Sequence, residues 1–310
     1  MAVVVADVLI TIDTELSAGL HQRGFDAAAN HAASIEGRTA DGAVGIGWLM
    51  DQLDAHGLTG VFFVDPMPAL VHGPGILPPI VAPILARGHE AQLHVHTEWL
   101  AWATASPVGG RQGRNIGDFA LDDQVTLLSV ARDLLEEAGA PRPIAFRAGN
   151  YGADARTLEA LARLGFRWDS SGGAFPGALP TDARHPDVAA APVGGLYDRP
   201  GHVRPAQVCA LSAREMAAAL RHAAGEDAPF CIVTHSFEML SRDRRRANRA
   251  VMARFDAMCG AIAGTPGLRS TGFAGLRPGG GPARMAPPNL FRTVGRMAEQ
   301  AMAALRYEHA

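Results

Sequence analysis

The chain has 310 residues, of which 48% are hydrophobic, and a formal net charge of -3. This length and composition allow a large buried core, while the small negative charge argues against a protein that binds nucleic-acid phosphates. The three cysteines, Cys209, Cys231 and Cys259, are widely spaced and include no C-x-x-C pair. We therefore expect buried thiols rather than a disulfide framework or a thiolate zinc site.

The chain begins with an apolar run, residues 2–12, that leads directly into Asp13 and Glu15. The run has no basic segment before it and no small-residue cleavage site after it, so we interpret it as a buried first strand rather than a signal peptide. No segment of the chain approaches the roughly 20 apolar residues that a membrane helix needs. We expect a soluble, cytoplasmic protein with no membrane partner.

Short apolar runs then alternate with longer segments whose apolar residues recur at helical spacing. The expected strands are residues 3–12, 60–64, 90–94, 144–147, 166–169 and 230–235. The expected helices are residues 44–56, 76–87, 124–138, 155–164, 213–223 and 249–263. This alternation predicts parallel strands joined by right-handed crossovers, in a barrel or in an open doubly wound sheet.

Three regions depart from the alternation. Residues 16–42 and 103–120 are long, polar or glycine-rich segments that we expect to shape a substrate groove, with disorder as the alternative. At residues 278–282, a Pro-Gly-Gly-Gly-Pro sequence breaks the chain before an amphipathic helix expected at about 288–306. We predict a barrel domain at 1–275 and an appendage at 276–310 that packs on the barrel or on a second subunit of a homodimer.

Acidic and imidazole side chains occur in pairs at the ends of two expected strands. Asp13 and Glu15 are two residues apart on an extended segment, and so are His94 and His96, so the members of each pair share one face. Two imidazoles with one carboxylate are typical of a catalytic zinc site with an open position for water. Such a metal lowers the pKa of water and polarises a carbonyl, which predicts metal-dependent hydrolysis.

Five motifs follow one another along the chain: Thr11-Ile12-Asp13-Thr14-Glu15, Gly88-His89-Glu90 running into His94-Val95-His96-Thr97-Glu98, Phe146-Arg147 with Asn150-Tyr151-Gly152, Trp168-Asp169-Ser170-Ser171, and Val233-Thr234-His235. Their order resembles the polysaccharide deacetylase family, also called carbohydrate esterase family four, over about residues 5–275. The resemblance implies a distorted seven-stranded (β/α) barrel and an enzyme that removes acetyl groups from N- or O-acetylated carbohydrates. It also implies one divalent metal, which we expect to be Zn²⁺, with Co²⁺, Ni²⁺ or Mn²⁺ as alternatives.

The resemblance implies five catalytic residues. Asp13 matches the family's catalytic base, and Arg147 is expected to pair with it and hold it ionised. The backbone N–H of Tyr151 matches a donor to the oxyanion, although one inserted residue and the absence of the family's proline alter that motif. His235 matches the acid that protonates the leaving group, and Asp169 is expected to orient it.

The metal ligands depart from the family pattern at two positions. Thr14 stands where the family has a metal-binding aspartate, so Glu15 is the nearest carboxylate that can take this role. His94 matches the first imidazole ligand, but the family's second histidine falls on Glu98. Either His96 supplies a nitrogen or Glu98 supplies an oxygen, and we favour His96 because a continuing strand points it to the same side as His94.

These two departures leave other functions open. One alternative is a metal-dependent amidohydrolase that acts on a small amide or ureide. Another is a catalytically inactive relative that binds carbohydrate.

Overall fold

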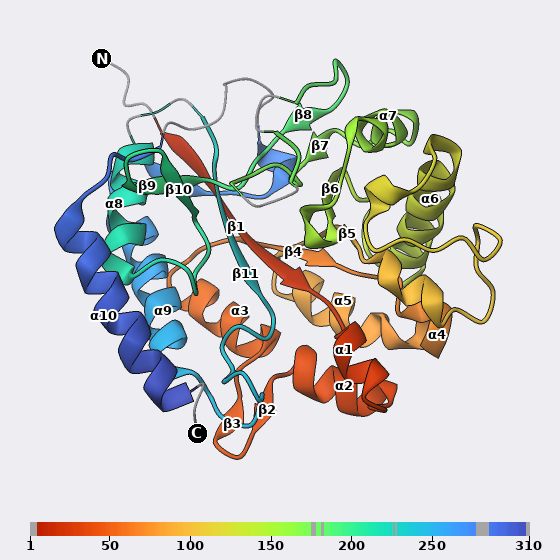
Figure 1. The fold of residues 1–310 in the computed structure, drawn as a ribbon, viewed down its shortest axis with the longest axis horizontal. Helices are drawn as coiled ribbons and strands as arrows, with labels where there is room; N and C mark the ends of the chain where they lie inside the picture. Colours follow the sequence, from red (N-terminus) through yellow and green to blue (C-terminus); the bar gives the residue numbers. More distant parts are fainter. Residues whose placement is uncertain are drawn as a thin grey trace. The chain divides into compact units, whose positions relative to one another are not determined.

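The computed structural model describes residues 5–174, 178–180, 183–224, 226, 228–276 and 285–307 (Figure 1). Internal contacts divide the chain into two compact units. Unit 1 consists of Met1–Ile12, Ala32–Gly60 and Val193–Ala310, and unit 2 consists of Asp13–His31 and Val61–Pro192.

The main sheet has the strand order β11-β1-β4-β5-β6-β7-β8, and β12 pairs with β1. Its strands are β1 (Ala6–Thr14), β4 (Gly60–Val64), β5 (Glu90–Val95), β6 (Ala145–Ala148), β7 (Trp168–Asp169), β8 (Ala189–Ala190), β11 (Phe230–His235) and β12 (Leu268–Ser270). Parallel strands alternate with helices along the chain, and the architecture is that of a distorted (β/α)7 barrel. The predicted fold class is confirmed.

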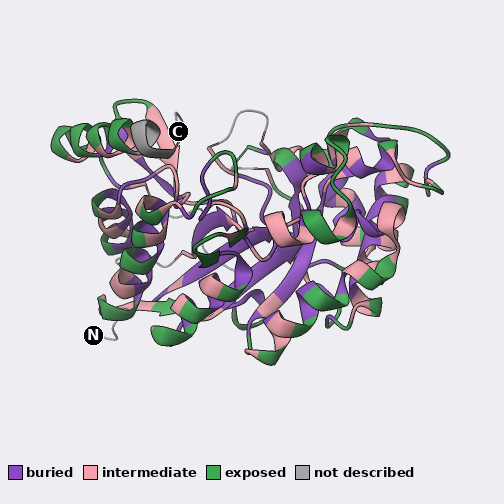
Figure 2. Ribbon diagram, turned by 90° about the horizontal axis from the view of Figure 1, so that it is seen from below, coloured by how far each residue is buried: buried purple, intermediate pink, exposed green. Residues whose placement is uncertain are grey.

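In unit 2, the parallel strands β4 to β8 pair in sequence order. All five residues of β4 and the last five of β5 are buried, and Figure 2 shows strands of the sheet mostly in the colour of buried residues. Burial on both faces explains the continuously apolar sequence of β4, whereas β5 alternates polar and apolar residues and buries Gln92 and His94 among them. The register between β5 and β6 places His94 opposite Arg147, which brings two predicted site residues side by side.

The helices of unit 2 are α1 (Ala18–Gln22), α4 (Ala69–His72), α5 (Pro78–Ala86), α6 (Leu121–Glu137) and α7 (Ala155–Arg163). Its 3-10 turns are η1 (Pro74–Ile76), η2 (Thr97–Ala101), η3 (Ile116–Asp118) and η4 (Gly149–Tyr151). Asp154 begins α7, because its side chain accepts a hydrogen bond from the backbone N of Thr157. The long segment at 16–42 is folded: it contains α1, α2 (Ala27–Ser34), β2 (Arg38–Thr39) and β3 (Gly42–Ala43).

Unit 1 contains α3 (Ile46–Ala55), α8 (Ala213–Ala223), α9 (Arg249–Gly264), η5 (Phe273–Gly275) and α10 (Leu290–Tyr307). Ser212 and Glu215 form a capping box at the start of α8. An antiparallel hairpin of β9 (Gly195–Arg199) and β10 (His202–Pro205), which the sequence did not predict, also lies in this unit. Cys231 and Cys259 are buried, Cys209 is half-buried, and none of the three described cysteines forms a disulfide.

Helix α10 contacts α8 and β9, and a buried arginine of the helix forms hydrogen bonds with both. Arg296 is 2% exposed and donates hydrogen bonds to Asp198 and Glu215. The apolar residues point outward instead: Leu290, Phe291, Val294, Met297 and Met302 are exposed. The predicted linker at 278–282 lies outside the described residues, and the domain boundary and the homodimer stay predictions. None of the helices in the described ranges, α10 included, has the length and hydropathy to cross a membrane.

Candidate metal centre and active site

Unit 2 brings together the three predicted metal ligands Glu15, His94 and His96. Glu15 directly follows β1, His94 lies in β5, and His96 comes directly after β5. The Oε2 atom of Glu15 lies 3.2 Å from Nε2 of His94 and 2.6 Å from Nε2 of His96. His96 has an extended backbone, with φ -103° and ψ 105°, so it continues the strand, and its ring centroid lies 4.9 Å from that of His94.

Hydrogen bonds at the far side of each ring set the tautomers. Nδ1 of His94 lies 2.8 Å from the backbone O of Arg147, and a carbonyl oxygen can only accept, so Nδ1 carries the hydrogen. Nδ1 of His96 lies 3.0 Å from Oε2 of Glu98, and this carboxylate occupies the position from which a metal-binding imidazole is oriented. With a metal bound, each imidazole would be neutral and would present a bare Nε2 on the side that faces Glu15.

The donor set fits a divalent cation. Oε2 of Glu15 is buried and lies between Nε2 of His94 and Nε2 of His96. Burial raises the pKa of Glu15, but His96 and His94 outweigh this effect and hold the pKa well below its usual range. Burial lowers the pKa of His96, but Glu15 outweighs it and raises the pKa well above its usual value. A cation shared by one carboxylate oxygen and two imidazole nitrogens satisfies all three atoms.

The segment after β6 supports His96. A Cβ atom at Gly149 would lie 2.7 Å from Cγ and Nδ1 of His96, so only glycine leaves room for the ring. The next two residues, Asn150 and Tyr151, both have left-handed backbones, with φ 54° and 56°. The Asn150 side chain bonds to Glu98, which in turn accepts from His96. Consecutive left-handed residues other than glycine are costly and tend to occur at functional sites.

The predicted pair of Arg147 and Asp13 is present in unit 2. Nη1 of Arg147 lies 2.6 Å from Oδ1 of Asp13, and the two side chains are 0% and 2% exposed. Arg147 also donates to Oγ and to the backbone O of Ser170, and its guanidinium lies 4.4 Å from the centre of the Phe63 ring. These contacts fix the orientation of the Asp13 carboxylate.

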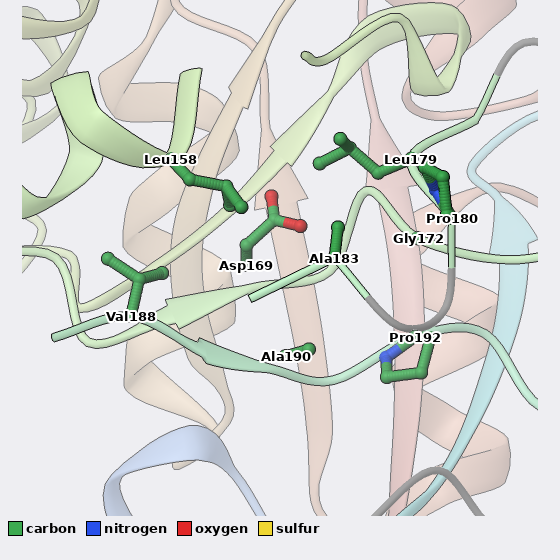
Figure 3. A pocket seen from close by; sticks show the side chains of 9 residues that line it. All are labelled: Leu158, Asp169, Gly172, Leu179, Pro180, Ala183, Val188, Ala190 and Pro192. Atoms are coloured by element: carbon green, nitrogen blue, oxygen red, sulfur yellow. The ribbon is translucent and has the colours of Figure 1, made fainter. Parts of the chain in front are cut away.

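Asp169 lies at the end of β7 and has both carboxylate oxygens occupied by Ser171. Oδ1 accepts from Oγ of Ser171 at 2.7 Å, and Oδ2 accepts from its backbone N at 3.1 Å. Figure 3 shows the carboxylate facing a small pocket with apolar lining from Leu158, Leu179 and Val188. Burial raises the pKa of Asp169 to about 6.

His235 lies in unit 1, at the end of β11. Its Nδ1 atom is 2.8 Å from Oε1 of Glu238, a carboxylate that the sequence analysis did not identify. Oε2 of Glu238 accepts a hydrogen bond from Thr234. The predicted contact between Asp169 and His235 would join the two units and stays a prediction.

Asp65 is a further site residue that sequence reasoning missed. It is 1% exposed and directly follows β4. Its Oδ1 atom accepts from the backbone N of Met67 at 3.0 Å and of His96 at 3.4 Å. Burial raises the pKa of Asp65 to about 6, against the opposing effect of His96 and His94. The signal that identified Asp13, an acidic residue at the end of an apolar strand, was also present here.

No family model matches the chain, and no curated protein matches it. Among solved structures, it is similar to a candidate polysaccharide deacetylase from Mycobacterium smegmatis, with a TM-score of 0.58 and 17% identity over 88% of this chain and 89% of that one. It is also similar to a 4-alpha-glucanotransferase from Thermococcus litoralis, with a TM-score of 0.50 and 8% identity over 87% of this chain and 40% of that one. A family 4 carbohydrate esterase from Streptomyces lividans gives a TM-score of 0.46 and 13% identity over 91% of this chain and 98% of that one.

The fold and the site define a (β/α)-barrel protein with a candidate metal centre where its strands end. At these identities the comparisons show a shared fold, and at that level they confirm the predicted resemblance to the polysaccharide deacetylases. A glucanotransferase shares the fold as well, so the reaction has to be argued from the site.

Proposed function

We propose that the protein is a metal-dependent hydrolase that removes an acetyl group from an N- or O-acetylated carbohydrate, and that it represents a divergent branch of the polysaccharide deacetylase family. The observation that carries the proposal is the convergence of Glu15, His94 and His96. Asp13, held by Arg147, lies two residues before Glu15, near the end of β1. The fold shared with a candidate polysaccharide deacetylase supports the substrate class.

Glu15 and the two Nε2 atoms of His94 and His96 would hold one divalent ion, for which Zn²⁺ suits the donor set best. When bound, this ion supplies a Lewis acid that polarises the acetyl carbonyl and lowers the pKa of water.

The chain's own groups move the protons and bind the developing charge. Asp13 accepts the proton of the attacking water, and Arg147 keeps its carboxylate oriented and charged. The backbone N–H of Tyr151 donates to the oxyanion that forms as water adds to the carbonyl. His235 donates a proton to the leaving group, and Glu238 stabilises its charged imidazolium. The orienting role of Asp169 belongs to the same proposal.

The test compares Asp13→Asn with the wild type in acetate release from N-acetylated oligosaccharides and acetylated xylan, with elemental analysis of both proteins. Loss of a general base predicts a fall in kcat of about 10²–10⁴-fold. Metal content should stay unchanged, because Asp13 is not among the proposed ligands. Asp133→Asn makes the same change at an exposed position of α6 and should alter neither kcat nor metal content.

His94→Ala should lose both metal and turnover. Wild-type turnover in Asp13→Asn would refute Asp13 as the base. Hydrolysis confined to a panel of small amides and ureides would replace the carbohydrate substrate with a small molecule. Binding of oligosaccharide without any hydrolysis would indicate an inactive carbohydrate-binding relative.

A further inference from the structure

The carboxylate of Asp65 is only partly satisfied. Oδ1 accepts from two backbone N–H groups, those of Met67 and His96. Oδ2 is buried and has no hydrogen-bond partner in the described residues. Leaving a buried carboxylate oxygen unpaired is costly, so this atom indicates a partner that the protein itself does not supply.

The charges around Asp65 belong to the candidate metal centre. Its carboxylate interacts electrostatically with His96, His94 and Glu15. Imidazoles bind metal in their neutral form, so in the loaded protein neither His96 nor His94 would carry the charge that balances Asp65. The positive charge near Asp65 would then be that of the divalent ion, for which Glu15 alone supplies only one negative charge.

Asp13 is another buried carboxylate of unit 2, but it differs from Asp65 in having a charged partner. Its Oδ1 atom pairs with the guanidinium of Arg147 at 2.6 Å. Asp65 receives backbone N–H groups instead, which orient it without neutralising it.

We infer that Asp65 is a positioning residue of the metal centre: its carboxylate balances the charge of the bound cation, and its Oδ1 holds the backbone of His96 in place. Oδ2 remains as an acceptor for a group bound at the centre. The inference rests on the proposed metal site and adds to it a second carboxylate, which acts through His96 and through charge rather than as one of the three converging ligands.

The experiment measures the Kd for Zn²⁺ alone, by competition with a chelating dye, for the wild type and for Asp65→Asn. Asparagine keeps the size of the side chain and an oxygen that can accept from the Met67 amide, but removes the charge. Loss of such an outer partner predicts a Kd raised by about 10–100-fold. A merely structural role in orienting Met67 predicts an unchanged Kd.

Asp154→Asn is the control, because Asp154 is also a carboxylate of unit 2 that accepts from backbone and side-chain donors, but it lies at the start of α7 and outside the proposed metal centre and catalytic residues. Its Kd for Zn²⁺ should equal that of the wild type. Asp65→Glu keeps the negative charge and should bind Zn²⁺ more tightly than Asp65→Asn, which also provides a comparison if the asparagine variant folds poorly by circular dichroism.

The two proposals fail in different ways. A Kd for Asp65→Asn within about twofold of the wild type, well below the effect expected of an outer partner, would overturn the role of Asp65 and leave the hydrolase intact. Wild-type protein that binds Zn²⁺ and loses affinity in Asp65→Asn, but releases no acetate from any acetylated substrate, would overturn the proposed reaction and support the role of Asp65.

Discussion

Each unit buries a group of charged side chains, and the two groups differ in whether their atoms are satisfied. In unit 1, the Arg296 network joins Arg296 to Asp198 at 3.0 Å and to Glu215 at 3.1 Å. His202 and Arg204 also donate to Asp198, and Ser212 donates to Glu215. Every carboxylate oxygen in this network has a donor.

In unit 2, the Glu15 cluster consists of Glu15, His94, His96 and Asp65. Oδ2 of Asp65 has no hydrogen-bond partner within the described part of the chain, and Oε2 of Glu15 faces two imidazole nitrogens that could themselves bind a metal. Unpaired buried atoms cost stability, so a fold retains them where something else binds. The Arg296 network therefore stabilises the fold, whereas the Glu15 cluster is arranged for a ligand, and substitutions in the two groups should affect different measurements.

The largest effect is expected for Arg296→Met, which leaves the carboxylates of Glu215 and Asp198 buried without their shared cation. Breaking a buried ion pair by removing one partner lowers the free energy of unfolding by about 3–5 kcal/mol. Urea denaturation of the two proteins measures this change, and Zn²⁺ binding by the folded variant should be retained.

Arg292→Met serves as the control on the same helix, because Arg292 is half-buried and donates to the backbone O of Pro287. Its effect should be about 0.5 kcal/mol or less. An equally small effect for Arg296→Met would contradict the structural role of the network.

Glu15→Gln should weaken Zn²⁺ binding and leave the stability of the metal-free protein largely unchanged. Zn²⁺ at a concentration of 1,000 times its Kd stabilises a folded protein by about 4 kcal/mol relative to the metal-free form. The wild type and Arg296→Met should both show this increment between chelator-treated and Zn²⁺-loaded samples. Glu15→Gln should lose most of it, because a proposed ligand is neutralised. An increment equal to that of the wild type would remove Glu15 from the site.

Asp169 is the intermediate case, since both of its oxygens are paired but its pKa is raised by burial from 3.8 to about 6. Between these pH values the folded protein holds a proton that the unfolded chain has released, so this group lowers the free energy of unfolding as pH rises. The contribution is at most about 3 kcal/mol. In chelator-treated protein, Asp169→Asn should therefore lose stability less steeply between pH 4 and 6, and a slope equal to that of the wild type would contradict the assignment.

The sequence predicted the strands and most helices well where local pattern determines them. β4 and β11 have the predicted bounds, because β4 is a short apolar run and β11 is an apolar run that ends in Thr234 and His235. α8 also has its predicted bounds, since Ser212 and Glu215 mark its start. The hairpin of β9 and β10 was missed, because its strands are not markedly apolar and are half-buried in part.

At the site, the sequence predicted the proximity of Glu15, His94 and His96 from the period of an extended strand and from the resemblance. It could not show which nitrogen of His96 faces Glu98, because that depends on η4, more than 50 residues further along the chain. Asp65 was missed although it too follows an apolar strand, because its contact with His96 is made only in the fold. Glu238 was missed although it lies only three residues after His235, its hydrogen-bond partner. For α10, the sequence predicted an apolar stripe that packs on the barrel or on a second subunit. Within the chain, the Arg296 network lies on the buried side of the helix while the exposed side carries apolar residues, and packing on a second subunit stays a prediction.

The backbone at Gly149, Asn150 and Tyr151 has a consequence for how quickly the centre can respond. Two adjacent left-handed residues cost of order 1–3 kcal/mol each, and this cost is part of the folding free energy rather than of metal binding. The imidazole of His96 is therefore already held between the backbone of Gly149 and the carboxylate of Glu98 before a metal binds. Binding of a cation should consequently require little reorganisation of the polypeptide, and the entropic cost of ordering the ligands should be low.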